Sequence, residues 1–230
     1  VFLAVAGNEK RAAAGLTRQN WKSAVLIVLA FVGIYIVRTV VSVAVQGVSD
    51  GSGMQYVKEW AAMFKNPMMW LNIAALPINY FFVFIAFFGE EYGWRYYLQP
   101  VLQKRFGLRA GVIILGVVWG LWHIPDDLFY YTQTSGIQMI FAQQITCISL
   151  GIFFAYAYMK TQNIWVPVCL HYLNNNLIPI ISGTLSADVL ENQNVSWRDL
   201  PVAVVLNGLC FGFFLLADVF KKKEIEKENS

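Results

Sequence analysis

Long apolar runs separated by short polar segments dominate the chain. A helix of about 20 apolar residues crosses the hydrocarbon core of a bilayer, and six runs approach or reach that length. They cover residues 23–45, 67–88, 110–125, 137–159, 164–181 and 201–217. The pattern predicts an all-α fold, a polytopic membrane helical bundle with about six visible transmembrane helices.

A different pattern separates the first two runs. In residues 57–64 the apolar side chains recur at helical spacing, and Lys58 and Glu59 lie between them. An amphipathic segment of this kind is typical of a helix that lies in the membrane interface. We therefore expect one short interfacial helix, and its functional alternative is a substrate-gating element.

Composition agrees with a membrane protein. Apolar residues make up 57% of the chain and charged residues 13%, whereas soluble domains carry about 25% charged residues. The six runs leave no room for a soluble domain, so residues 1–230 are expected to form a single membrane domain. Cys147, Cys169 and Cys210 are scattered among apolar segments, and we interpret them as small hydrophobic residues.

The basic residues lie at the ends of the apolar runs. They gather in residues 10–22, in 104–109, at Lys160 and in 221–223, and they alternate with loops that are poor in basic residues. The positive-inside rule then places both visible termini in the cytoplasm. We expect an integral, multi-pass protein of a bacterial cell membrane, with no nucleic-acid partner. The chain begins at Val1, so it is either processed or a fragment, and the count of six spans is a minimum.

Two adjacent carboxyl groups follow the second apolar run. Ionisable residues within a membrane are rare and usually mark a pathway, an ion pair or a reaction centre. Glu91 and Arg95 are four residues apart and share a helix face, so they are natural partners. Glu90 points about a quarter-turn away and lacks this partner, which leaves it available as a general base. The alternative is a purely structural network of both carboxylates and the arginine that braces two helices.

The chain has two histidines, and both fall inside the predicted spans. His171 and Asn175 are four residues apart, so both side chains can point at one target. Because each can donate a hydrogen bond, the pair suits a developing oxyanion. The alternative is that these polar groups are interhelical hydrogen bonds of the ordinary kind.

Depth in the membrane tests this grouping. For Glu90 and His123 to meet His171, the second helix must continue past Glu91 toward Leu102. The third helix must continue past Pro125 or break there. The polar cluster would then lie within the membrane and be reached by water from the cytoplasmic side.

Three motifs now occur in order: Glu90-Glu91-x-x-x-Arg95, Trp119-x-x-x-His123 and His171-x-x-x-Asn175. Together they resemble the motifs of the CPBP family. That family comprises the type II CAAX prenyl endopeptidases and the Abi proteins, which process bacteriocins or confer immunity to them. The resemblance covers about residues 84–176, a family-like catalytic core. It departs from the family pattern at Trp119, where Phe is more frequent, and at Tyr96, where a small residue is common.

The resemblance implies an intramembrane glutamate endopeptidase without an obligatory metal or other cofactor. Its substrates would be membrane-associated peptides or proteins, such as CAAX-type tails or leader and signal peptides. By this resemblance Glu90 is the general base that activates water, and His123 positions that water. His171 and Asn175 stabilise the tetrahedral oxyanion.

The other two motif residues have a supporting role by the same resemblance, in which Glu91 and Arg95 hold the helix and tune Glu90. The substrate, its prenylation and the oligomeric state stay open. The immediate partners expected are the lipid bilayer and the peptide substrate.

Two alternatives compete with this interpretation. A zinc protease could use Glu90, His123 and His171 as ligands with an open water position, but the chain has no His-Glu-x-x-His motif and Asn175 would have no role. A non-enzymatic membrane protein, either a bacteriocin-immunity protein or a proton-coupled carrier, could also bury such groups. Short loops and the absence of paired, inverted broken helices count against a carrier.

Overall fold

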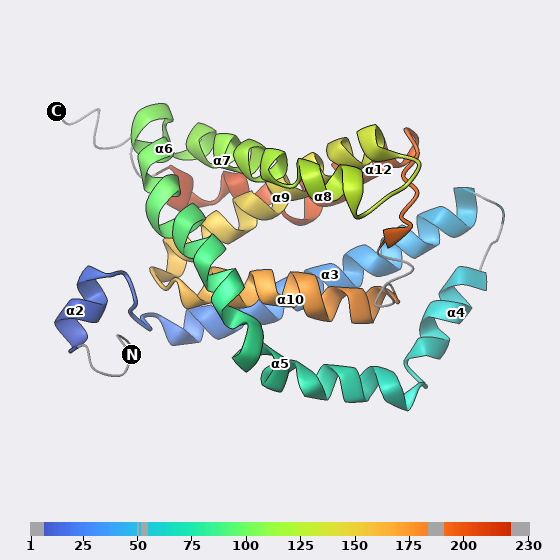
Figure 1. Ribbon diagram of the computed structural model, residues 1–230, viewed down its shortest axis with the longest axis horizontal. Coiled ribbons are helices and arrows are strands. Elements are labelled where there is room, and N and C mark those ends of the chain that lie inside the picture. The colour runs from blue at the N-terminus through green and yellow to red at the C-terminus, as the bar shows by residue number, and fades with distance from the viewer. Residues whose placement is uncertain (1–6, 50, 52–54, 184–190, 222–230) are drawn as a thin grey trace.

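The computed structural model describes residues 7–49, 51, 55–183 and 191–221, and this part of the chain is helical and contains no strand. The long helices run side by side in Figure 1, with α5 along one edge and α7 along the opposite edge. In chain order the elements are α2 (Asn8–Ala13), α3 (Trp21–Ser49), α4 (Gln55–Met63), α5 (Pro67–Glu91), the π-helix η1 (Tyr92–Leu98), α6 (Gln99–Phe106), α7 (Leu108–Trp122), α8 (Ile124–Phe129), α9 (Gly136–Thr161), α10 (Trp165–Ser182), α12 (Asp199–Cys210) and the 3-10 helices η2 (Gly212–Leu216) and η3 (Asp218–Phe220).

Helix α9 lies at the centre of the bundle, where it contacts α3, α7, α8, α10 and α12 (Figure 1). Aromatic side chains fill the space around it. The ring of Phe31 in α3 lies 5.6 Å from that of Phe153 and 6.0 Å from that of Phe154, centroid to centroid. Phe211, just after α12, lies 5.8 Å from Phe31. This aromatic core joins α3, α9 and the C-terminal segment.

Small residues let α7 approach α9 closely. A Cβ on Gly116 of α7 would lie 2.6 Å from the Cα of Ile148 in α9, and a Cβ on Gly151 would lie 3.4 Å from the Cα of Gly116. Membrane helices use small residues in this way to bring their backbones together. The contact fixes the position of α7, whose last turn leads into His123.

The second predicted helix does continue past Glu91, as the sequence indicated. The chain is helical without interruption from Pro67 to Phe106, through α5, η1 and α6. It rises in Figure 1 from α5 at one edge to α7 at the other. The run ends at Gly107, whose φ of 88° is a left-handed value that favours glycine. Glu90 and Glu91 therefore lie in the middle of a helix, next to a π-helical turn of the kind that is frequent at functional sites.

The third predicted helix breaks as expected. Helix α7 ends at Trp122, His123 lies at the junction, and α8 begins at Ile124 with Pro125 in its first turn. Proline is tolerated in a first turn because its missing N–H would have no intrahelical partner there. The junction places the His123 side chain at the end of one helix and the start of another.

Four of the about six predicted spans correspond to helical runs that are long and apolar enough to cross a membrane. By length and composition, four helical runs in the described residues can cross a membrane: Trp21–Val45, Pro67–Phe106, Leu108–Phe129 and Gly136–Thr161. Helix α10 falls outside this set, and its polar residues, among them His171 and Asn174 to Asn176, account for its lower hydropathy. Helix α12 ends at Cys210 after 12 residues, which is only about 18 Å of helix.

The structure bears on some of the remaining sequence predictions and leaves others untested. A helix is found where the short interfacial helix was predicted at 57–64, namely α4 (Gln55–Met63), and its location in the membrane interface stays a prediction. Lys222 and Lys223, which contributed to the charge pattern, lie outside the described residues. The placement of both termini in the cytoplasm and the bacterial origin stay predictions.

Candidate active site

One face of the α5–η1 helix carries a buried ion pair. Glu91 and Arg95 are both fully buried, and Nε of Arg95 lies 2.8 Å from Oε2 of Glu91. The spacing of four residues indicated this pair. The guanidinium also lies over the rings of Trp119 and Phe154, 5.1 and 5.4 Å from their centroids. Such cation–π contacts stabilise a cation that has left water.

His171 completes this buried group. Its Nδ1 lies 2.9 Å from Oε1 of Glu91, and the residue is 3% exposed. The imidazole packs against the ring of Phe87 at 5.1 Å. We expected Glu90 to face His171, but the structure joins His171 to Glu91. The reason is geometric: Phe87, Glu91 and Arg95 are spaced by four and share the face that packs on α10, whereas Glu90 is rotated from it by about 100°.

The indole of Trp119 lies between the two histidines. Its centroid is 5.4 Å from that of His171 and 5.9 Å from that of His123. Nδ1 of His123 lies 2.9 Å from the backbone oxygen of Trp119. A carbonyl oxygen only accepts hydrogen bonds, so Nδ1 carries the hydrogen and Nε2 keeps its lone pair. Cys147 flanks the same ring nitrogen, with its Sγ 3.9 Å away.

Glu90 borders a pocket on the other face of the helix. The pocket has a volume of about 410 Å³, and Glu90 is partly buried at its wall. Within the described part of the chain, its Oε2 is buried and has no hydrogen-bond partner. A Cβ on Gly89 or Gly93 would meet nothing within 4 Å, so the helix is open on this side. The remaining lining residues are Trp94, Tyr97, Leu98 and Trp122.

Asn175 lies one helical turn beyond His171 and is exposed. Its Oδ1 accepts a hydrogen bond from Nδ2 of Asn174 at 2.8 Å. Its own Nδ2 is therefore the amide group that this bond leaves available. The structure thus gathers Glu91, Arg95 and His171 directly and brings His123 to them through Trp119, while Glu90 and Asn175 stand at the border of the group.

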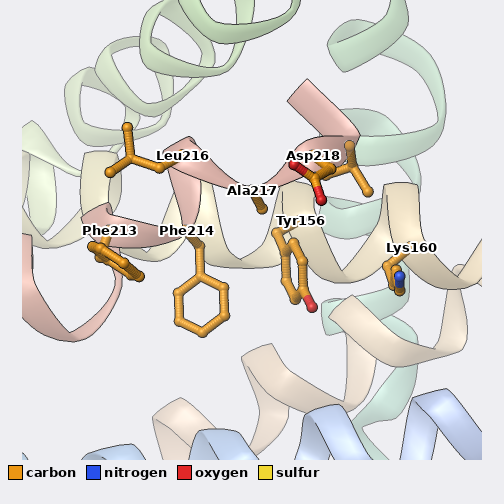
Figure 2. A pocket seen from close by; sticks show the side chains of 8 residues that line it. Tyr156, Lys160, Phe213, Phe214, Leu216, Ala217 and Asp218 are labelled. Atoms are coloured by element: carbon orange, nitrogen blue, oxygen red, sulfur yellow. The ribbon is translucent and has the colours of Figure 1, made fainter. Parts of the chain in front are cut away.

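A second pocket of about 410 Å³ lies away from these residues, between α9 and the C-terminal 3-10 helices (Figure 2). Its polar groups are Tyr156, Lys160 and Asp218. The rest of the lining is apolar, and it includes neither a histidine nor a glutamate: Phe213, Phe214, Leu216, Ala217 and Val219. This second pocket therefore holds none of the candidate site residues, whereas the first pocket is bordered by Glu90.

The side chains do not fit the zinc hypothesis. Among the described residues, no group of three His, Cys, Asp or Glu side chains is arranged to hold a metal ion. His171 directs Nδ1 to Glu91, and His123 directs Nδ1 to a backbone oxygen. The proposed ligands Glu90, His123 and His171 therefore do not form a donor set in this structure.

Two residues of the site were missed or undervalued in the sequence. The sequence marks Trp119 only as a departure from the family pattern, yet its ring contacts both histidines and Arg95. Asn174 belongs to none of the three motifs, yet it hydrogen-bonds Asn175. The run of three asparagines at 174–176 was the available signal, because adjacent amides in an apolar helix need partners.

Comparison with known proteins adds independent evidence. Residues 70–177 match the family model described as type II CAAX prenyl endopeptidase Rce1-like, and this range contains all seven residues named in the three motifs. CAAX prenyl protease 2 of Methanococcus maripaludis is 27% identical to this chain over 125 residues, which is 50% of this chain and 45% of that protein. The alignment thus spans less than half of the relative's length. No solved structure matches the chain.

Proposed function

We propose that this membrane protein is an intramembrane endopeptidase in which Glu90 activates water, because residues 70–177 match the model of the type II CAAX prenyl endopeptidase Rce1-like family. The family implies a protease, hence peptide substrates and a membrane environment. The substrates we propose are the carboxyl-terminal tails of membrane-anchored proteins, or leader and signal peptides.

The observation that carries this proposal is the different state of two neighbouring carboxyl groups. Glu91 is engaged on both oxygens, by Arg95 and by His171. Glu90 lines an open pocket and keeps one buried oxygen without a partner. A general base must be able to reach the proton that it takes. Glu90 meets that requirement, and Glu91 does not.

The first step is attack by water. The Glu90 carboxylate takes one proton of the water, and Nε2 of His123 accepts a hydrogen bond from the other. The water oxygen forms a bond to the carbonyl carbon of the substrate, and the electron pair of the C=O π bond moves to the oxygen. Groups that meet this developing charge in a water-poor site accelerate the reaction strongly.

The second step needs an oxyanion site and a proton for the leaving amine. Nδ2 of Asn175 is the amide group that the bond from Asn174 leaves available, and it would donate to the oxyanion. Nδ1 of His171 already donates to Glu91, so Nε2 of His171 would donate to the oxyanion only in the imidazolium form, in which both ring nitrogens carry a hydrogen. When the C–N bond breaks, the proton held by Glu90 passes to the nitrogen, so an amine and a carboxylic acid leave and Glu90 is a carboxylate again.

The test is mass spectrometry of a membrane-delivered peptide library incubated with the purified protein in detergent. The unmodified protein is expected to cleave at defined bonds, and Glu90→Gln to lower the rate at least about 1,000-fold, the loss typical of a missing principal catalytic group. Glu59→Gln is the matched control, because Glu59 is an exposed glutamate on α4 whose carboxylate is bonded only locally, by Gln55.

Each outcome has a distinct meaning. Full activity of Glu90→Gln with an unchanged thermal midpoint would remove Glu90 from the chemistry. Loss of activity on stringent chelation, restored by zinc, would favour the metal-dependent alternative. Failure of the unmodified protein to cleave any member of the library would favour the bacteriocin-immunity role.

A further inference from the structure

A buried tyrosine on α3 reaches Asn174, the neighbour of Asn175 on α10. Tyr35 is 5% exposed, and its ring is held edge-on against Phe31 and beside Phe211, with both centroids 5.0 Å away. The guanidinium of Arg38 lies 5.8 Å from the ring centroid, and its Nε donates to Oδ1 of Asn207 at 2.9 Å. The ring is therefore fixed by α3 and the C-terminal segment, and only its hydroxyl reaches α10.

The hydroxyl begins a directed chain of hydrogen bonds. Tyr35 donates to Oδ1 of Asn174. Because that amide oxygen accepts, the amide nitrogen of Asn174 must lie on the other side, where Nδ2 donates to Oδ1 of Asn175 at 2.8 Å. Asn175 then presents only its Nδ2, which has two hydrogens to donate. The donor at one end of the chain sets the orientation of the amide at the other end.

Without this chain of hydrogen bonds, the side-chain amide of Asn175 has two orientations of the same shape, in which its oxygen and nitrogen exchange places. In one orientation the NH2 group faces the substrate, and in the other the carbonyl oxygen does. An oxyanion is stabilised by the first and repelled by the second. Preorganisation of the donor before the reaction is what makes an oxyanion site effective.

We propose that Tyr35, acting through Asn174, is a positioning residue that holds the Asn175 amide with its N–H groups toward the oxyanion. The inference rests on the proposed function. It adds a residue from α3, which lies outside the segment 70–177 that matches the family.

The first test is steady-state kinetics of Tyr35→Phe, which keeps the ring and removes the hydroxyl. We expect kcat to fall about 10-fold with KM unchanged, less than the 100- to 1,000-fold loss on removing an oxyanion donor outright. Asn174→Asp keeps the acceptor for Tyr35 but removes the donor to Asn175, and we expect a loss at least as large. A peptide phosphinate, which carries a tetrahedral anion, should bind about 10-fold more weakly to both variants.

The control is Tyr172→Phe. Tyr172 is similarly buried, at 3% exposed. Its hydroxyl donates to the backbone oxygen of Leu76 at 2.7 Å and accepts from Nδ2 of Asn79 at 3.2 Å, so its partners are neither Asn174 nor Asn175. We expect a lower thermal midpoint, a kcat within about two-fold of the unmodified protein, and unchanged phosphinate affinity.

The decisive comparison uses the Asn175→Ala background. If Tyr35 acts only through Asn175, Tyr35→Phe will not weaken phosphinate binding further when the amide is absent. An equal weakening in both backgrounds, or none in either, overturns the positioning role while the protease function stands. An unmodified protein without any cleavage overturns the protease function and this inference together.

Discussion

The two faces of the α5–η1 helix differ more than their neighbouring positions in the chain suggest. One face, made by Phe87, Glu91 and Arg95, packs against α7, α9 and α10 and contains an ion pair fully removed from solvent. The other face, made by Gly89, Glu90 and Gly93, borders an open pocket. Glu90 and Glu91 are separated by a rotation of about 100° around the helix. Both carboxylate oxygens of Glu91 are bonded, whereas Oε2 of Glu90 has no hydrogen-bond partner among the described residues.

This difference shows how a protein can place two carboxylates in a membrane for different purposes. A buried charge is tolerated when it is paired and hydrogen-bonded, and Glu91 has both Arg95 and His171 for this. The glycines on the other face remove side chains that would otherwise cover Glu90. One face therefore gives rigidity, and the other gives access.

The largest effect is expected when the buried ion pair between Glu91 and Arg95 is removed. Arg95→Leu leaves the Glu91 carboxylate buried with His171 as its remaining partner, and removing one member of a buried pair costs about 3–5 kcal/mol. We expect a large fall in thermal midpoint, measured by differential scanning fluorimetry in detergent, and loss of activity through unfolding. Arg105→Leu is the control, because Arg105 is exposed on α6, and a fall as large as that of Arg95→Leu would mean that the ion pair has no special role.

A smaller effect is expected when the open face is filled. Gly93→Leu places a side chain in the Glu90 pocket, where a Cβ meets nothing within 4 Å. We expect kcat/KM to fall about 10- to 100-fold, because a pocket discriminates by this much against a few added methyl or methylene groups. Stability should not fall, since leucine favours helix over glycine by about 0.8 kcal/mol.

The control for that substitution is Gly208→Leu on α12, a helical glycine whose Cβ position is also open but lies outside the pocket. It should leave kcat/KM unchanged. Equal losses in the two variants would show that leucine at any open glycine disturbs the protein, and that the Glu90 pocket does not receive substrate.

The smallest effect is expected for the indole ring of Trp119, which lies between His171 and His123. Trp119→Phe replaces the indole with a smaller ring. This reduces the contact area with both histidines and weakens the cation–π interaction with Arg95. The indole nitrogen is buried without a hydrogen-bond partner in the described residues, so no hydrogen bond is lost. We expect destabilisation of about 1–2 kcal/mol and activity within about five-fold, measured on the same peptide. A loss near that of Glu90→Gln would indicate that the indole itself takes part in the site.

Local rules predicted a good part of this arrangement. The spacing of four between Glu91 and Arg95 indicated their pair, and the polar and aromatic residues after Glu91 indicated that the helix continues. Pro125 marked the break beside His123. These features depend on a few neighbouring residues, which a sequence displays directly.

Features that depend on packing between distant helices were harder to predict. Which carboxylate meets His171 depends on the rotation of α5 against α10, and residues 80 positions apart set that rotation. Tyr35 meets Asn174 across 139 positions. Hydropathy also does not show where α12 ends, so the sequence could not indicate that this helix has only 12 residues.

The most direct test of the separate roles of the two carboxylates is one paired measurement on Glu90→Gln and Glu91→Gln: thermal midpoint in detergent and cleavage rate on a single peptide. Glu90→Gln should keep the midpoint of the unmodified protein and lose cleavage. Glu91→Gln should lower the midpoint by several degrees, because a neutral amide cannot balance Arg95. A Glu90→Gln variant that cleaves at the normal rate, together with a Glu91→Gln variant that is stable and inactive, would reverse the assignment.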